Sequence, residues 1–115
     1  MQRGKIVLTP FPFTNLAGSK LRPAIVVSGV SKIGADVIVA FSSTVFNSDK
    51  LSPTEELLLA NNSEFALTGL KKDSVFKMDK LATIEKSIIV GELGEVSKVL
   101  QEKLNAKLKI ALALT

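Results

Sequence analysis

The sequence contains neither cysteine nor histidine among its 115 residues. Without cysteine, the chain can form no disulfide and no thiolate metal site. Without histidine, it lacks the most common general base and the most common nitrogen ligand of transition metals. Any acid–base chemistry must therefore come from other groups, and we expect the protein to use no metal ion and no other cofactor.

Long apolar segments are also missing from the sequence. No run reaches the roughly 18 apolar residues that a membrane span needs. The first residues, MQRGKIVLTP, have neither the apolar core nor the cleavage site of a signal peptide. We therefore expect a cytoplasmic protein without a membrane partner. No low-complexity stretch interrupts the chain, so its length predicts a single domain over residues 1–115.

Basic residues are in modest excess. Lysine and arginine number 15 against 11 aspartates and glutamates, which gives a formal net charge of +4. This surplus favours an anionic partner such as a nucleic acid, although many proteins carry a similar surplus for solubility alone. Apolar residues make up 46% of the sequence and charged residues 23%, which is the balance of a folded globular protein.

Short apolar, β-branched runs alternate with turns rich in glycine and proline along most of the sequence. The runs predict strands, of which the second and third form a hairpin, at residues 4–9, 22–29, 35–43, 74–84 and 86–94. Residues 54–60 fit a further strand or a short helical piece, and residues 61–73 a loop with one helical turn. The prolines, glycine and asparagine of residues 10–20 predict an irregular loop.

One clear helix is predicted, from residue 95 to about residue 111. Its apolar face is formed by leucines at every fourth position, namely Leu100, Leu104, Leu108 and Leu112. Gly94 and Glu95 suit its start, the first by backbone freedom and the second by its charge at the positive end of the helix dipole. Many short strands with one terminal helix predict a mainly β fold, built on a small, strongly curved antiparallel sheet.

Three segments of the sequence resemble, in the same order, segments of the MazF/PemK family of toxin endoribonucleases. They are RGKIVLTPFPFTNLAGSKLRPAIVVSG, VIVAFSST and GLKKDSVFKMDKLATI. The resemblance covers nearly the whole chain and implies an SH3-like curved sheet or small barrel with added helices, assembled as a homodimer. It also implies a toxin of a type II toxin–antitoxin system that cuts single-stranded RNA at short sequences without a metal ion. The implied protein partner is a cognate antitoxin, whose extended segment occupies the RNA groove.

Arg22 and Ser42 are the catalytic residues that this resemblance implies. In a metal-free cut, the 2′-hydroxyl beside the scissile phosphate attacks it and leaves 2′,3′-cyclic phosphate and 5′-hydroxyl ends. The protein must position the phosphate and stabilise its developing charge, which suits the rigid and permanently charged fork of Arg22. Ser42 matches the family's catalytic threonine position, and we expect its hydroxyl to donate a hydrogen bond in the transition state rather than to act as a nucleophile.

Further residues are expected to bind RNA. They are Phe11, Phe13, Gly18, Ser19, Lys20, Ser43, Thr44, Asp79 and Lys80. Either Phe11 or Phe13 can stack on a base, and we expect only one of them to do so. Residues 18–20 offer backbone and cationic contacts to phosphate. Asp79 and Lys80 match positions that line the family's base-reading groove, but their identities do not disclose the recognised bases.

The sequence also leaves two functions without catalysis open. One is a gyrase poison resembling CcdB, which shares the architecture, and the other is a plain nucleic-acid-binding barrel. A poison needs neither Arg22 nor Ser42 in these places, so the pair favours cleavage. Each residue also has a purely structural explanation, since Arg22 could be a solvated arginine before a strand and residues 42–44 an ordinary turn at a strand end.

Overall fold

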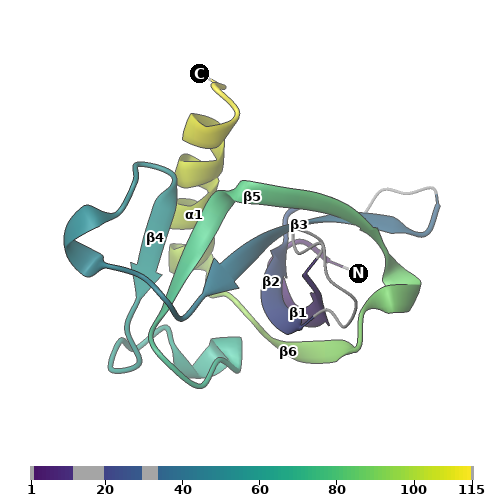
Figure 1. Ribbon diagram of the computed structural model, residues 1–115, viewed down its shortest axis with the longest axis horizontal. Coiled ribbons are helices and arrows are strands. Elements are labelled where there is room, and N and C mark those ends of the chain that lie inside the picture. The colour runs from purple at the N-terminus through teal and green to yellow at the C-terminus, as the bar shows by residue number, and fades with distance from the viewer. Residues whose placement is uncertain (1, 12–19, 30–33, 115) are drawn as a thin grey trace.

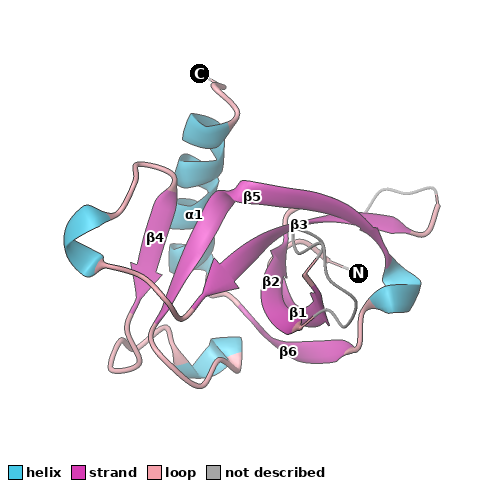
Figure 2. Ribbon diagram, viewed as in Figure 1, coloured by secondary structure: helices cyan, strands magenta, loops and turns pink. Residues whose placement is uncertain are grey.

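The computed structural model describes residues 2–11, 20–29 and 34–114. In these ranges six strands form one antiparallel sheet, in the order β4-β5-β3-β2-β1-β6 (Figures 1 and 2). The strands are β1 (Lys5–Pro10), β2 (Leu21–Val26), β3 (Asp36–Ser43), β4 (Glu55–Leu58), β5 (Ser74–Glu85) and β6 (Gly91–Glu95). The helix α1 (Lys98–Ala111) follows β6, and the 3-10 turns η1 (Ser48–Lys50), η2 (Ala66–Thr68) and η3 (Lys86–Ile88) lie in connections. The predicted mainly β fold with a C-terminal helix is confirmed.

The sheet is strongly curved, and a bulge in β5 contributes to the curvature. Along β3, Ala40 pairs with Leu81 but the next residue, Phe41, pairs with Lys77. The intervening residues 78–80 of β5 therefore have no counterpart on β3, and such bulges bend a strand and increase its twist. Figure 1 shows β5 changing direction sharply near its middle, and in this view β1, β2 and β6 curl round below it.

Buried side chains occupy both faces of the sheet. One face packs against α1, and its buried cluster includes Ile6, Ile25, Ala40, Phe76, Met78, Leu100 and Leu104. The other face carries a second buried cluster, made of Val7, Ala24, Val26, Val37, Val39, Phe41 and Ile84. The strands alternate between the two clusters residue by residue, as the period of a pleated strand requires. A sheet covered on both faces also explains why its strands read as nearly continuous apolar runs.

The start predicted for the helix is wrong. Gly94 and Glu95 belong to β6, where they pair with Ile6 and Lys5 of β1. The helix begins at Lys98, and its N-cap is Ser97, whose hydroxyl accepts a hydrogen bond from the backbone N–H of Leu100. Serine can satisfy a free N–H at a helix start, which glycine cannot do with a side chain. Strand pairing with β1 therefore keeps residues 94 and 95 out of the helix.

The remaining strand predictions are mostly confirmed. The predicted hairpin is the antiparallel pair of β2 and β3, the strand at residues 74–84 is β5, and residues 54–60 contain a strand, β4. The strand predicted for residues 86–94 is wrong in its first half, because residues 86–88 form η3 and β6 begins only at Gly91. In the described part of the chain, no helix has both the length and the apolar character needed to cross a membrane.

Candidate active site

A cavity of about 260 Å³ brings together several residues predicted to act on RNA. It is lined by Phe11, Arg22, Phe41, Ser42, Ser43, Lys77 and Lys80. Arg22 and Ser42 thus come from neighbouring strands, β2 and β3, to the wall of the same cavity. Their catalytic roles remain predictions, and those roles require that both residues lie at one cavity, as they do here.

Arg22 is the second residue of β2 and is partly buried. The central carbon of its guanidinium lies 5.1 Å from the centroid of the Phe11 ring. Phe11 in turn packs edge-on against Phe41, with ring centroids 5.0 Å apart and an angle of 70° between the rings. The cation–π contact and the aromatic pair hold the guanidinium at the cavity wall. Arg22 is therefore not the fully solvated side chain that a purely structural explanation would need.

The β2–β3 ladder ends at Pro23, next to Arg22. The last paired residues are Ala24 and Phe41, and one step further Pro23 would face Ser42. Proline has no N–H to donate to the neighbouring strand, so the ladder cannot continue there. Instead, the Ser42 hydroxyl donates a hydrogen bond to the carbonyl oxygen of Pro23 at 3.2 Å. Because a hydroxyl has only one proton, Ser42 can donate to a phosphate only after it releases this carbonyl.

The other predicted RNA-binding residues do not all reach this cavity. Ser43 and Lys80 line it, whereas Thr44 lines a separate cavity of about 350 Å³. Lys20 and Asp79 are exposed and lie outside the lining of the first cavity. Phe13, Gly18 and Ser19 lie outside the described residues.

Ser43 forms a local turn at the end of β3. Its hydroxyl oxygen accepts a hydrogen bond from the backbone N–H of Val45 at 3.0 Å and donates one to the Val45 carbonyl at 3.1 Å. This is the turn that the purely structural explanation of the hydroxyl cluster predicts. The two serines therefore differ in their contacts. The Ser42 hydroxyl bonds to the neighbouring strand β2, whereas the Ser43 hydroxyl bonds within the turn that follows β3.

Lys77 also lines the cavity. Its ammonium group donates a hydrogen bond to the carboxylate of Glu55 on β4 at 2.6 Å. This hydrogen bond is the main reason that the pKa of Glu55 lies below its usual value. Nothing in the sequence distinguishes Lys77 from the other lysines, because it reaches the cavity only through the bulge that sets it opposite Phe41.

The lining of the cavity is positively charged. Arg22, Lys77 and Lys80 contribute three cations, of which Lys77 is paired with Glu55, and none of the described lining residues is acidic. Such a lining suits an anion, and the planar guanidinium can offer two parallel donors to a phosphate. Among the residues that the structure describes, no group of three or more acidic side chains is arranged to hold a metal ion.

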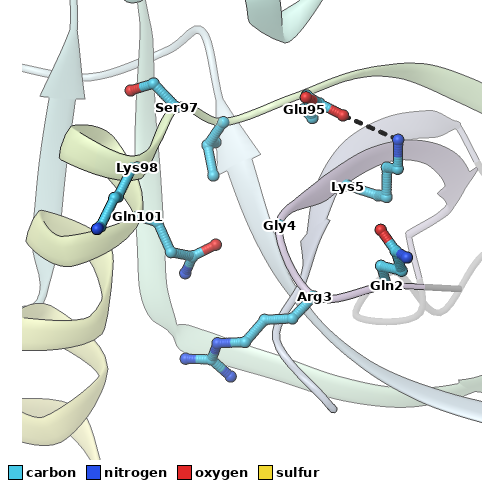
Figure 3. A pocket seen from close by; sticks show the side chains of 9 residues that line it. Gln2, Arg3, Gly4, Lys5, Glu95, Ser97, Lys98 and Gln101 are labelled. Atoms are coloured by element: carbon cyan, nitrogen blue, oxygen red, sulfur yellow. Dashed lines mark hydrogen bonds and ion pairs between the residues drawn. The ribbon is translucent and has the colours of Figure 1, made fainter. Parts of the chain in front are cut away.

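A different cavity, of about 240 Å³, lies where the N-terminal residues meet the start of α1 (Figure 3). Lys5 forms an ion pair with Glu95 at 2.9 Å, and this hydrogen bond raises the pKa of Lys5. Arg3 donates hydrogen bonds to the side chain of Asn105, at 2.6 Å, and to the carbonyl of Val27. Because the lining of this cavity includes the carboxylate of Glu95, the cavity is less suited to an anionic ligand than the cavity around Arg22.

The sequence matches the family model of PemK-like, MazF-like toxins of type II toxin–antitoxin systems over residues 2–112. The chain belongs to this family. No curated protein sequence matches the toxin.

Several solved structures share the fold of this PemK-like toxin. An endoribonuclease in complex with its cognate antitoxin, from Mycobacterial species, has a TM-score of 0.77 at 23% identity, over 100% of this chain and 97% of that chain. The Mycobacterium tuberculosis toxin MazF-mt6 has a TM-score of 0.71 at 19% identity, over 96% of this chain and 98% of that chain. The MazE–MazF structure from Deinococcus radiodurans has a TM-score of 0.72 at 21% identity, over 100% of this chain and 98% of that chain. At these identities the likeness establishes the fold, and the curved-sheet architecture predicted from the sequence is confirmed.

Proposed function

We propose that this PemK-like toxin is an endoribonuclease that cuts single-stranded RNA, with Arg22 as electrostatic catalyst and Ser42 as hydrogen-bond donor. The observation that carries the proposal is that Arg22 and Ser42 line one cavity together with two further cations, Lys77 and Lys80. Membership of the toxin family supports it. A structure of similar fold is an endoribonuclease bound to its cognate antitoxin, which also agrees with this activity.

The chemistry assigns the nucleophile to the substrate. The 2′-oxygen attacks the adjacent phosphorus, the bond from phosphorus to the 5′-oxygen breaks, and the products carry 2′,3′-cyclic phosphate and 5′-hydroxyl ends. The phosphorane gains negative charge during attack, and Arg22 stabilises that charge through its terminal nitrogens. In the proposed mechanism, solvent water takes the 2′-proton and returns one to the 5′-oxygen.

The proposal is tested by incubating the purified protein with a mixed-sequence RNA in excess EDTA and identifying the fragment ends. We expect cyclic phosphate and 5′-hydroxyl ends, and we expect Arg22→Ala to slow cleavage by roughly 10²–10³-fold, as loss of a transition-state donor does in other enzymes. The matched control is Arg3→Ala, which removes the only other arginine and lies outside the cavity. Thermal melting checks that both variants are folded.

Two results would contradict the proposal. The first is an Arg22→Ala variant that cuts RNA as fast as the unchanged protein. The second is intact RNA under all conditions, and a gyrase assay then separates the remaining functions. Inhibited gyrase would favour a poison, and RNA binding without any cut would favour a binding barrel.

We further infer that the toxin forms a homodimer and binds a cognate antitoxin in the cytoplasm. Two structures of similar fold are complexes with antitoxins, which supports binding of an antitoxin. Support for a homodimer comes from large apolar side chains that are exposed on and beside α1, namely Val99, Ile110, Leu112 and Leu114. Light scattering from the purified chain should give twice the mass of one chain, and a monomer at micromolar concentration would contradict the dimer.

A further inference from the structure

Two buried polar atoms beside the cavity have no hydrogen-bond partner among the described residues. They are Oγ1 of Thr9 and Nε of Arg22. Thr9 is completely buried, with 0% of its surface exposed. Unpaired buried polar atoms are uncommon in folded proteins, and each carries a desolvation penalty. Their occurrence at two neighbouring residues therefore calls for a shared explanation.

Thr9 and Arg22 face each other across one rung of the sheet. They are directly opposite in the pairing of β1 with β2. Side chains of directly opposite residues project from the same face of an antiparallel pair, with their Cβ atoms about 4.5–5.5 Å apart. Nε–H of arginine can only donate a hydrogen bond, and a threonine hydroxyl can accept one. The two unpaired atoms are therefore chemically complementary and lie within reach of each other.

Thr9 is not among the residues that line the cavity, and it is completely buried. Its shape matches that of valine, and strands favour both residues. The hydroxyl is the only feature that distinguishes Thr9 from an ordinary core residue, and a buried hydroxyl destabilises the fold unless it is paired.

We propose that Thr9 is a positioning residue for Arg22, an inference that rests on the proposed role of Arg22 in the cavity. In the structure the guanidinium lies over the Phe11 ring. A phosphate that enters the cavity attracts the two terminal nitrogens, and a small rotation of the side chain then brings Nε–H to Oγ1 of Thr9. The hydroxyl fixes the plane of the guanidinium, and both terminal nitrogens remain available to the phosphate.

The first test compares Thr9→Val, which removes the hydroxyl and keeps the shape, with Thr9→Ser, which keeps the hydroxyl. We expect Thr9→Val to lower kcat for RNA cleavage about tenfold, the effect of losing one hydrogen bond to a charged group, with little change in KM. Its melting temperature should be equal or higher, because an unpaired buried hydroxyl is gone. Thr9→Ser should cleave within about twofold of the unchanged protein.

A double-mutant cycle sharpens this test. In an Arg22→Lys background no Nε–H exists, so adding Thr9→Val should cause no further loss of rate. Thr9→Val and Thr9→Ser variants that are equally slow would overturn the proposal, because packing would then explain both. A Thr9→Val variant with an unchanged rate would overturn it as well.

The second test does not depend on RNA cleavage. We expect inorganic phosphate to slow the exchange of the Arg22 Nε–H proton with water, as seen in ¹⁵N–¹H NMR spectra. The slowing should persist in Thr9→Ser and disappear in Thr9→Val. If the protein cuts no RNA but this pattern is found, the proposed function fails and the positioning role stands. If phosphate slows exchange equally in Thr9→Val, the positioning role fails whatever the enzyme does.

Discussion

In the proposed reaction, the hydroxyl of Ser42 serves two acceptors in turn. Ser42 is 5% exposed, and its hydroxyl donates a hydrogen bond to the Pro23 carbonyl at 3.2 Å in the structure. In the proposed reaction the same hydroxyl donates its hydrogen bond to a phosphate oxygen, so its bond to the carbonyl must break as the substrate binds. The bond to Pro23 therefore holds the hydroxyl at the cavity wall until a stronger, charged acceptor arrives.

This double role predicts the effect of two substitutions at one position. Ser42→Ala should slow cleavage by about 10²-fold, in the range found for loss of one oxyanion donor, while Ser42→Thr should keep most of the activity because the hydroxyl remains. The measurement is the single-turnover rate on an oligonucleotide that contains a mapped cleavage site. Ser28→Ala is the control, since this hydroxyl accepts a hydrogen bond from the backbone N–H of Ile38 at 3.1 Å and Ser28 is not among the residues that line the cavity. Equal rates for Ser42→Ala and the unchanged protein would contradict the assignment.

The sequence could predict some residues of the cavity but not others. Arg22 precedes one apolar run and Ser42 follows another, and the resemblance to the toxin family identified both as candidate site residues. Thr9 ends such a run too, but there it reads as one more β-branched core residue. Lys77 depends on a three-residue bulge, and a bulge results from how two distant strands pair, which no local pattern of residues specifies.

Among the elements, β6 illustrates how tertiary contacts override local preference. Its Gly94 lies so close to the turn η2 that a Cβ atom built there would be 2.4 Å from the carbonyl oxygen of Leu67. The glycine is therefore explained by close packing of backbone on backbone, not by the helix start that its position in the sequence suggests. The existence of α1 was predictable from its leucine period, whereas its first residue was not.

The packing of β6 on η2 predicts a large difference between two glycines of the same strand. Gly94→Ala should lower the free energy of unfolding by about 1–3 kcal/mol, because either β6 or η2 must move to admit the methyl group. Gly91→Ala meets no atom within 4 Å and should be neutral or slightly stabilising. Urea denaturation of both variants gives the two values. Similar losses for the two variants would show that general strand propensity, rather than this contact, determines the result.

At the scale of the whole molecule, the curved sheet brings cationic side chains together at one cavity although the net charge is small. The formal surplus is only +4, yet three cations line one cavity. They come from β2 and from two positions of β5, Lys77 just before the bulge and Lys80 within it, which the curl of the sheet brings together. Strand positions and the mainly β class were predictable from apolar periodicity, whereas this convergence follows from strand order and bulging.

This distribution predicts a specific salt dependence of nucleic-acid binding. Lys77 is ion-paired with Glu55, so we count two phosphate contacts, from Arg22 and Lys80, and the logarithm of the association constant should fall with the logarithm of salt concentration at a slope of about −1.4, from roughly 0.7 counterions released per contact on a single strand. An all-2′-deoxy oligonucleotide of a mapped cleavage sequence serves as ligand, because it cannot be cut. Fluorescence anisotropy across a salt series measures the slope.

Two arginine variants then separate the cavity from the overall charge. Arg22→Ala should make the slope shallower by about 0.7, since one phosphate contact is lost. Arg3→Ala removes the same formal charge, but its guanidinium is bound to Asn105 and Val27 outside the cavity, so the slope should stay unchanged. Equal changes of the slope in the two variants would mean that the overall positive charge of the protein, rather than the cavity, attracts the nucleic acid. That result would contradict a phosphate site at Arg22.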